Sequence, residues 1–197
     1  SILLIEDGQL IIVEGEAGSG KTVLMSTLLY ELGKYNLDLD ENLDIHLLVN
    51  HNEHVSIYSQ IASKLGIANK KNKIVQKPTS FINNNSSDEK VDVVIVDEAH
   101  LLLTQGKQSY QGKNHLDDLL ARAKVVVIVF DIKQVLTTEQ IWEVDKLNEY
   151  FDKAKSNSNH VTLRNQMRIN SDISTVNWIR NLVDYQVINS IPKDKLG

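Results

Sequence analysis

The residues from Gly15 to Thr22 have the spacing G-x-x-x-x-G-K-[ST] and read Gly-Glu-Ala-Gly-Ser-Gly-Lys-Thr. A loop that wraps a phosphate with its backbone N–H groups needs glycines, because glycine adopts dihedral angles that other residues disfavour. In this pattern Lys21 reaches the β- and γ-phosphates, and Thr22 offers its hydroxyl to Mg²⁺. The segment therefore predicts a triphosphate site. Its candidate contacts are Gly15, Glu16, Ala17, Gly18, Ser19, Gly20, Lys21 and Thr22.

Two acidic residues, Asp97 and Glu98, end the apolar run Val-Val-Ile-Val that begins at Val93. We expect this strand to lie directly beside the strand that leads into the phosphate loop. Asp97 is then placed to hold the metal through its water shell, and Glu98 to orient or deprotonate the water that attacks the γ-phosphate. Solvated acids at a strand end are the alternative interpretation. Together with residues 15–22, the pair favours hydrolysis over nucleotide binding alone.

Two further polar residues follow short apolar runs. Gln134 comes after the run that ends at Phe130, where it would lie near the γ-phosphate. Arg168 follows another short strand, and a guanidinium there could meet charge that develops on the transferred phosphoryl group. On physical grounds alone, a polar loop residue is an equal alternative for Gln134, and a surface arginine is the favoured interpretation of Arg168.

The elements that must position these residues alternate along the chain, which predicts βαβ units and a mainly parallel sheet in a single three-layer α/β domain. Expected strands are 10–14, 45–50, 91–96, 125–130 and 161–163. Expected helices are 21–34, 52–65, 114–124, 137–151 and 171–184.

The sequence also predicts where three of these helices begin or end and which side of one faces inward. Gly33 sits where the first helix is expected to stop. In the second helix, the apolar residues expected to face inward are Val55, Ile57, Tyr58, Ile61 and Leu65, with Gly66 ending the helix. Asn114 is expected to begin a later helix.

Composition bounds the class of protein. The 197 residues carry a formal net charge of −5, which argues against a uniformly basic nucleic-acid face. There are no cysteines, so disulfides and thiolate zinc sites are excluded, and no apolar run is long enough to cross a bilayer. We expect a cytoplasmic protein. Because the chain opens on Ser and a core strand follows almost at once, we expect residues 1–197 to be one domain of a longer chain.

The order of the motifs GEAGSGKT, VIVDEAH, FDIKQ and LRNQMR resembles the first motor domain of superfamily 1 DNA/RNA helicases. It is most similar to the helicase-like family known as domain of unknown function 2075, over about residues 10–184. The resemblance implies a RecA-like fold, ATP as nucleotide and Mg²⁺ as metal. It also implies that Gln134 senses the γ-phosphate and that Arg168 approaches it.

The pattern also departs from that superfamily. The third motif usually has Gly where this chain has Phe130, and the fourth commonly has an aromatic residue where Met167 stands. No second RecA-like half is found in the sequence, so we expect a second motor domain or a partner module outside it.

Two functions remain open at this point. The leading one is Mg²⁺-dependent ATP binding and hydrolysis by a helicase-like motor acting on DNA or RNA. The other is an ATP-controlled switch that governs an attached nuclease or partner protein without strand translocation. Glu98 and Gln134 count against a third, kinase-like function. The resemblance to superfamily 1 makes Asn50 and His51 candidate contacts to a single strand. Lys107, Tyr110 and Lys113 could stack and pair with a strand, but a mobile solvated loop is the favoured interpretation of these three.

Overall fold

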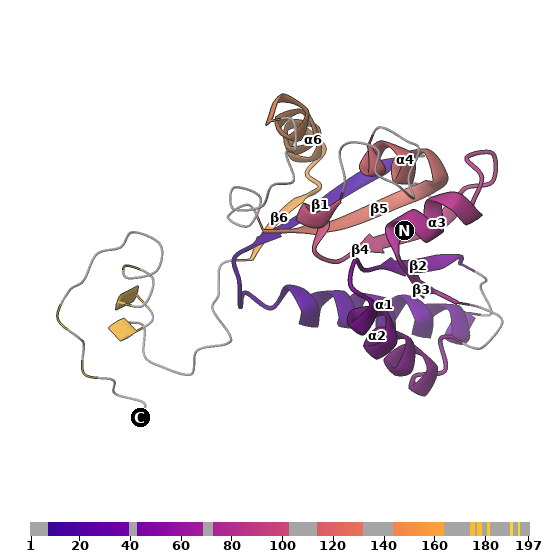
Figure 1. The fold of residues 1–197 in the computed structure, drawn as a ribbon, viewed down its shortest axis with the longest axis horizontal. Coiled ribbons are helices and arrows are strands. Elements are labelled where there is room, and N and C mark those ends of the chain that lie inside the picture. Colours follow the sequence, from indigo (N-terminus) through magenta and orange to yellow (C-terminus); the bar gives the residue numbers. More distant parts are fainter. Residues whose placement is uncertain are drawn as a thin grey trace.

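In the described part of the chain six strands form one sheet, and every pairing in it is parallel (Figure 1). The structure is a computed structural model that describes residues 8–39, 43–68, 73–102, 114–131 and 144–163, with a few single residues after 173. The strand order is β3-β2-β4-β5-β1-β6. The strands are β1 (Gln9–Gly15), β2 (Ile45–Leu48), β3 (Val75–Gln76), β4 (Val91–Val96), β5 (Ala123–Phe130) and β6 (His160–Leu163).

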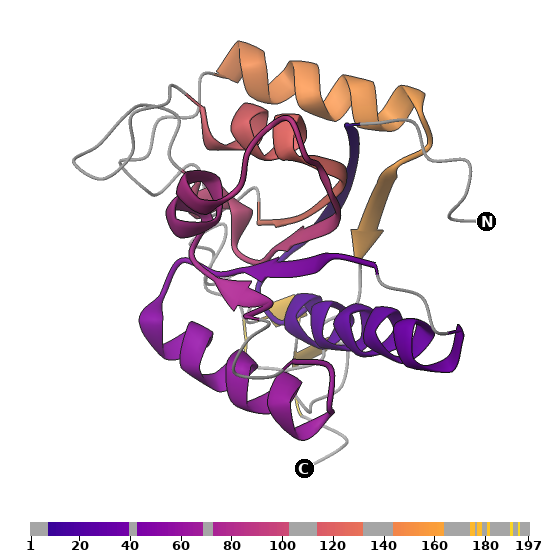
Figure 2. The ribbon, with the colours of Figure 1, turned by 90° about the vertical axis from the view of Figure 1, so that its right-hand side faces the viewer.

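Helices cover both faces of the sheet, as the crossover connections of a parallel sheet require. Figures 1 and 2 show α1 and α2 on one face and α3, α4 and α6 on the other. The described helices are α1 (Lys21–Leu39), α2 (Asn52–Lys64), α3 (Pro78–Asn84), the short 3-10 helix η2 (Ala99–Leu101), α4 (His115–Arg122) and α6 (Val144–Ser156). The architecture is a three-layer α/β domain of the RecA-like type.

The central strands alternate their side chains between two apolar cores. In β5, Val126, Ile128 and Phe130 face the core beneath α3, α4 and α6. The intervening Val125, Val127 and Val129 face the core beneath α1 and α2. Both faces are buried, which explains why this strand reads as one continuous apolar run. In β5 the polar side chains are therefore confined to the ends, at Lys124 and at Asp131, which follows the strand.

The predicted strands and one helix start agree with the structure. The strand predicted at 91–96 is β4, and the short strand at 161–163 is β6 with one further residue. The Asn114 side chain accepts hydrogen bonds from the backbone N–H groups of Leu116 and Asp117, so it caps α4 as expected. The two-residue strand β3 and the helix α3 were not predicted, because neither carries a periodic apolar pattern.

Gly33 does not end the first helix, because α1 continues to Leu39. A Cβ atom at Gly33 would lie 2.2 Å from Cγ2 of Ile67, so the glycine allows the chain after α2 to pack against α1. The prediction of a helix stop was therefore wrong. The physical reason for the glycine is close packing rather than termination.

The buried face of α2 also differs from the predicted one. Tyr58 and Ala62 are buried, whereas Ile57, Ile61 and Leu65 are 54%, 38% and 39% exposed. The helix ends as predicted, with Gly66 in the left-handed region at φ 73°. The orientation of α2 about its axis therefore places Tyr58 toward the sheet and leaves Ile57 and Ile61 more exposed.

The strand order corrects one prediction about the site. β4 is not beside β1, because β5 lies between them and pairs with both. The residue that follows β5, Asp131, therefore comes between the phosphate loop and Asp97. Of the helices described, none is long and apolar enough to span a membrane.

Candidate functional site

The loop from Gly15 to Thr22 joins the carboxyl end of β1 to the start of α1. Gly18 and Gly20 have φ angles of 85° and 90°, in the left-handed region that favours glycine. Gly15 lies in close packing, because a Cβ atom there would lie 2.3 Å from the Ser19 hydroxyl oxygen and 3.2 Å from Cβ of Leu163. The left-handed backbone thus explains Gly18 and Gly20, and close packing favours glycine at position 15.

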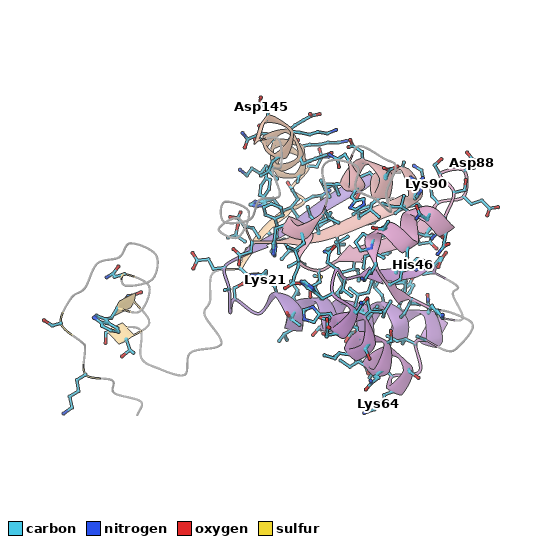
Figure 3. The ribbon with its side chains drawn as sticks, in the orientation of Figure 1. Lys21, His46, Lys64, Asp88, Lys90 and Asp145 are labelled. Carbon is cyan, nitrogen blue, oxygen red and sulfur yellow. The ribbon has the colours of Figure 1, made fainter. Side chains whose placement is uncertain are left out.

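Lys21 folds back over its own loop. Its Nζ donates to the carbonyl oxygens of Gly15 and Glu16 at 2.7 and 2.8 Å, and to Oδ2 of Asp131 at 3.2 Å. Figure 3 places Lys21 at the end of the sheet opposite Asp88 and Lys90, which lie in the loop before β4. Lys21 therefore sits at the carboxyl end of the sheet, where ligands of parallel α/β folds bind.

Asp131 was not among the predicted site residues. Its side chain is 2% exposed and forms an ion pair with Lys21. The signal was present in the sequence, since an acidic residue follows the buried strand that ends at Phe130. What the sequence lacked was the strand order, which brings the end of β5 next to the phosphate loop.

Asp97 is buried at the end of β4, with 4% exposure. Its backbone N–H donates to the carbonyl of Leu48 at 3.0 Å, so the ladder with β2 extends to this residue. Both of its carboxylate oxygens have protein donors. Oδ1 accepts from the Glu98 N–H at 2.9 Å, and Oδ2 accepts from the Tyr58 hydroxyl at 3.1 Å.

The Tyr58 hydroxyl lies where three polar side chains meet. Burial raises the pKa of the phenol well above its usual range, and the adjacent negative charge of Asp97 raises it further. The hydroxyls of Ser26 and Thr22 act on the same phenol and lower its pKa to a smaller degree. Tyr58 therefore stays protonated at neutral pH and acts as a hydrogen-bond donor between Asp97 on β4 and the first turn of α1.

Glu98 adopts a left-handed backbone conformation, with φ 53° and ψ 45°. A non-glycine residue rarely adopts it, and it turns the chain sharply from β4 into η2. The Glu98 Oε2 atom is enclosed and has no hydrogen-bond partner among the described residues. It lies 3.7 Å from His54 Nδ1 and 3.9 Å from His51 Nε2, both from the start of α2.

His100 lies behind the two acids and is 4% exposed. Burial lowers the pKa of its ring below the usual value, and the nearby charges of Glu98 and Asp131 only partly oppose this. His100 is therefore neutral at pH 7. It adds a polar ring near Glu98 and Asp131 without adding charge.

The residues present fit a nucleotide phosphate and a divalent metal. Within the described part of the chain, the Ser19 hydroxyl is buried and has no hydrogen-bond partner, which a phosphate oxygen would supply. Thr22 and Asp97 are oxygen donors of the kind that Mg²⁺ takes. No group of three or more His, Asp or Glu residues that could hold a metal by itself occurs in that part of the chain.

The structure brings together the phosphate loop, Asp97 and Glu98. Gln134 and Arg168 lie outside the described residues, as do Lys107, Tyr110 and Lys113. Of the candidate strand contacts, Asn50 and His51 are described. They lie at the end of β2 and the start of α2, with His51 exposed on the side of Glu98.

The chain has a curated relative in yeast. The chain is 33% identical over 185 residues to the uncharacterized protein YPL245W of Saccharomyces cerevisiae, which covers 86% of this chain and 40% of that protein. The chain thus spans less than half the length of the curated relative that it matches.

Two solved structures also resemble the fold. The flagellar accessory protein FlaH from Methanocaldococcus jannaschii is 17% identical, with a TM-score of 0.43, covering 75% of this chain and 69% of its own. The arterivirus nonstructural protein 10 (helicase) is 16% identical, with a TM-score of 0.48, covering 94% of this chain and 41% of its own.

The family comparison covers almost the whole chain. Residues 8–196 match the family described as Schlafen group 3, DNA/RNA helicase domain. That range includes the phosphate loop, both acids that follow β4, and the ion pair of Lys21 with Asp131. The chain belongs to the Schlafen group 3 DNA/RNA helicase domain family.

Proposed function

We propose that this chain binds ATP with Mg²⁺ and hydrolyses it to ADP and phosphate, as the motor domain of a helicase-like protein that acts on DNA or RNA. The observation that carries the proposal is the convergence at one sheet edge of Lys21, Asp97 and Glu98. The loop supplies backbone donors and a cation for the phosphates, and the end of β4 supplies a buried and a partly exposed carboxylate.

In this proposal the phosphate loop binds and orients the nucleotide. Lys21 exchanges its contacts with Gly15, Glu16 and Asp131 for oxygens of the β- and γ-phosphates. Thr22 and Asp97 hold Mg²⁺, which when bound neutralises charge that develops on the phosphate oxygens. The N-terminus of α1 adds its partial positive charge at the same place.

Glu98 is the proposed general base. Its carboxylate accepts a proton from water as the water oxygen bonds to the γ-phosphorus, and the bond from that phosphorus to the bridging oxygen of ADP breaks. The left-handed conformation of Glu98 turns its side chain out from the end of β4, and the enclosed Oε2 atom has no competing hydrogen bond among the described residues.

We further propose that Gln134 senses the γ-phosphate and that Arg168 stabilises charge on it. Both roles rest on the resemblance to superfamily 1 motors and on the position of each residue after a strand, β5 for Gln134 and β6 for Arg168. The narrower likeness to domain of unknown function 2075 stays a prediction, as do the cytoplasmic location and the single domain over residues 1–197.

The experiment that separates a motor from a switch is strand-stimulated hydrolysis. The full-length protein is assayed for phosphate release with and without single-stranded DNA and RNA, and the Glu98→Gln protein controls for contaminating ATPases. The motor proposal predicts faster release with at least one strand type. Hydrolysis that no strand stimulates would instead support the ATP-controlled switch that governs an attached nuclease or partner protein.

A further inference from the structure

The helix α2 contacts both acids of the candidate site from one of its faces. His51, His54 and Tyr58 are spaced three and four residues apart, which aligns them along one side of a helix. The two histidines lie beside Glu98, and the Tyr58 hydroxyl bonds to Asp97. Tyr58 is the member of this face that is buried, at 5% exposure.

We propose that Tyr58 is the residue that positions Asp97 for Mg²⁺. Its ring is packed in the core beneath α1 and α2 with Met25 and Ala62. This packing fixes the position of the hydroxyl relative to the sheet. The hydroxyl donates to Asp97 Oδ2 at 3.1 Å. This inference rests on the proposed binding of Mg²⁺ by Thr22 and Asp97.

Packing alone does not account for the hydroxyl. A phenylalanine would fill the same space, and burying a hydroxyl without a partner is unfavourable. Its carboxylate partner is charged, and such hydrogen bonds are among the stronger ones in proteins. The Glu98 N–H donates to Oδ1 and the Tyr58 hydroxyl donates to Oδ2, so together they fix the rotation of the Asp97 carboxylate about its Cβ–Cγ bond.

The same hydroxyl also links the two proposed metal ligands. Thr22 on the first turn of α1 is close enough to act on the phenol, as is Ser26 one turn later. Ser26 is itself oriented, since its hydroxyl donates to the Thr22 carbonyl at 2.9 Å. Tyr58 therefore bridges the end of β4 and the start of α1, the two places from which the proposed metal ligands come.

The test is Tyr58→Phe, which removes one oxygen and keeps the ring. Tyr150 offers a matched control, because it is equally buried and its hydroxyl donates to Asp117, a carboxylate on α4 away from the site. Thermal unfolding of both variants reports the loss of a buried hydroxyl bond. A structural role alone would change stability in both and the Mg²⁺ requirement in neither.

Hydrolysis by the full-length protein is measured against MgCl₂ concentration. Tyr58→Phe is expected to raise the Mg²⁺ concentration for half-maximal rate about tenfold, the effect of losing one charge-assisted hydrogen bond, with the rate at saturating Mg²⁺ changed much less. Tyr150→Phe is expected to keep the wild-type Mg²⁺ requirement. An unchanged requirement in folded Tyr58→Phe would overturn the inference while leaving the proposed ATPase intact.

A binding measurement separates this inference from the proposed function. The affinity of the protein for a fluorescent ATP analogue is measured at increasing MgCl₂ concentrations, which does not require hydrolysis. If the wild type does not hydrolyse ATP but Tyr58→Phe still needs more MgCl₂ for tight binding, hydrolysis fails and the positioning role stands. If MgCl₂ does not tighten binding to the wild type, the positioning role is overturned as well.

Discussion

Lys21 and Asp131 form an ion pair across the end of the sheet, with 3.2 Å between Nζ and Oδ2. The lysine begins α1, and the aspartate follows β5, the strand paired with β1. Both side chains are largely enclosed, at 14% and 2% exposure, so solvent screens the pair only in part. A phosphate that engages Lys21 must compete with Asp131.

Replacing Asp131 with Asn is therefore expected to tighten ATP binding. The change removes a negative charge that competes for Lys21 and that repels the phosphates, and an effect of about tenfold corresponds to one charge-assisted hydrogen bond. Equilibrium binding of a fluorescent ATP analogue without Mg²⁺ measures it. Weaker binding would show that Asp131 holds Lys21 in place for the phosphate instead of competing with it.

The left-handed conformation of Glu98 predicts a difference between two inactive variants. Glu98→Ala and Glu98→Gly both remove the carboxylate, but only glycine adopts φ 53° without steric cost. Glu98→Gly is expected to be more stable than Glu98→Ala by about 1 kcal/mol in denaturant unfolding. If alanine is the more stable of the two, the backbone at this position is not strained.

The buried His115 predicts a loss of stability in acid. Burial lowers the pKa of its ring to about 4 from 6.5. Between these two pH values the unfolded chain binds the proton and the folded protein does not, so stability falls as pH drops below 6.5. Through this effect the free energy of unfolding is expected to fall by about 3 kcal/mol between pH 6.5 and pH 4.

The His115→Gln variant supplies the control, because its side chain does not titrate. Chemical unfolding of both proteins from pH 7 to pH 4 should show a steeper decline for the wild type. Parallel declines would mean that His115 accepts its proton as easily in the folded protein as in the unfolded chain.

The packing of Gly33 against Ile67 predicts that Gly33→Ala destabilises the protein. Alanine favours a helix, so without a clash the change would stabilise α1. The new Cβ atom would lie 2.2 Å from Ile67 Cγ2 and 2.8 Å from its Cβ, and overpacking of this kind costs about 1 to 3 kcal/mol. Adding Ile67→Gly, which removes both of these Ile67 atoms, should make Gly33→Ala neutral or stabilising, and a double-mutant cycle measures this. Equal effects of Gly33→Ala in both backgrounds would exclude the clash.

Much of the site could be predicted because its signals are local. The phosphate loop, the run that ends at Asp97 and the Asn114 cap each occupy a few consecutive residues whose types and spacing are informative by themselves. The fold class followed from the alternation of strands and helices. These features depend on the neighbours of a residue in sequence.

The missed features depend on contacts between distant segments. Asp131 joined the site only through a strand order that places β5 between β1 and β4. Gly33 resembled a helix stop because Ile67, its partner, lies far along the chain. In α2, Ile57 and Tyr58 are both apolar enough for the core, and only the position of the sheet decides that Tyr58 faces inward.

The central claim is that this edge of the sheet binds Mg²⁺ and ATP and hydrolyses the nucleotide. The most direct measurement pairs ATP binding with phosphate release in the wild type, Lys21→Ala and Glu98→Gln. Lys21→Ala should lose tight binding, whereas Glu98→Gln should bind ATP as the wild type does and release phosphate at least about a hundredfold more slowly. Equal loss of binding in both variants, or wild-type turnover in Glu98→Gln, would contradict the claim.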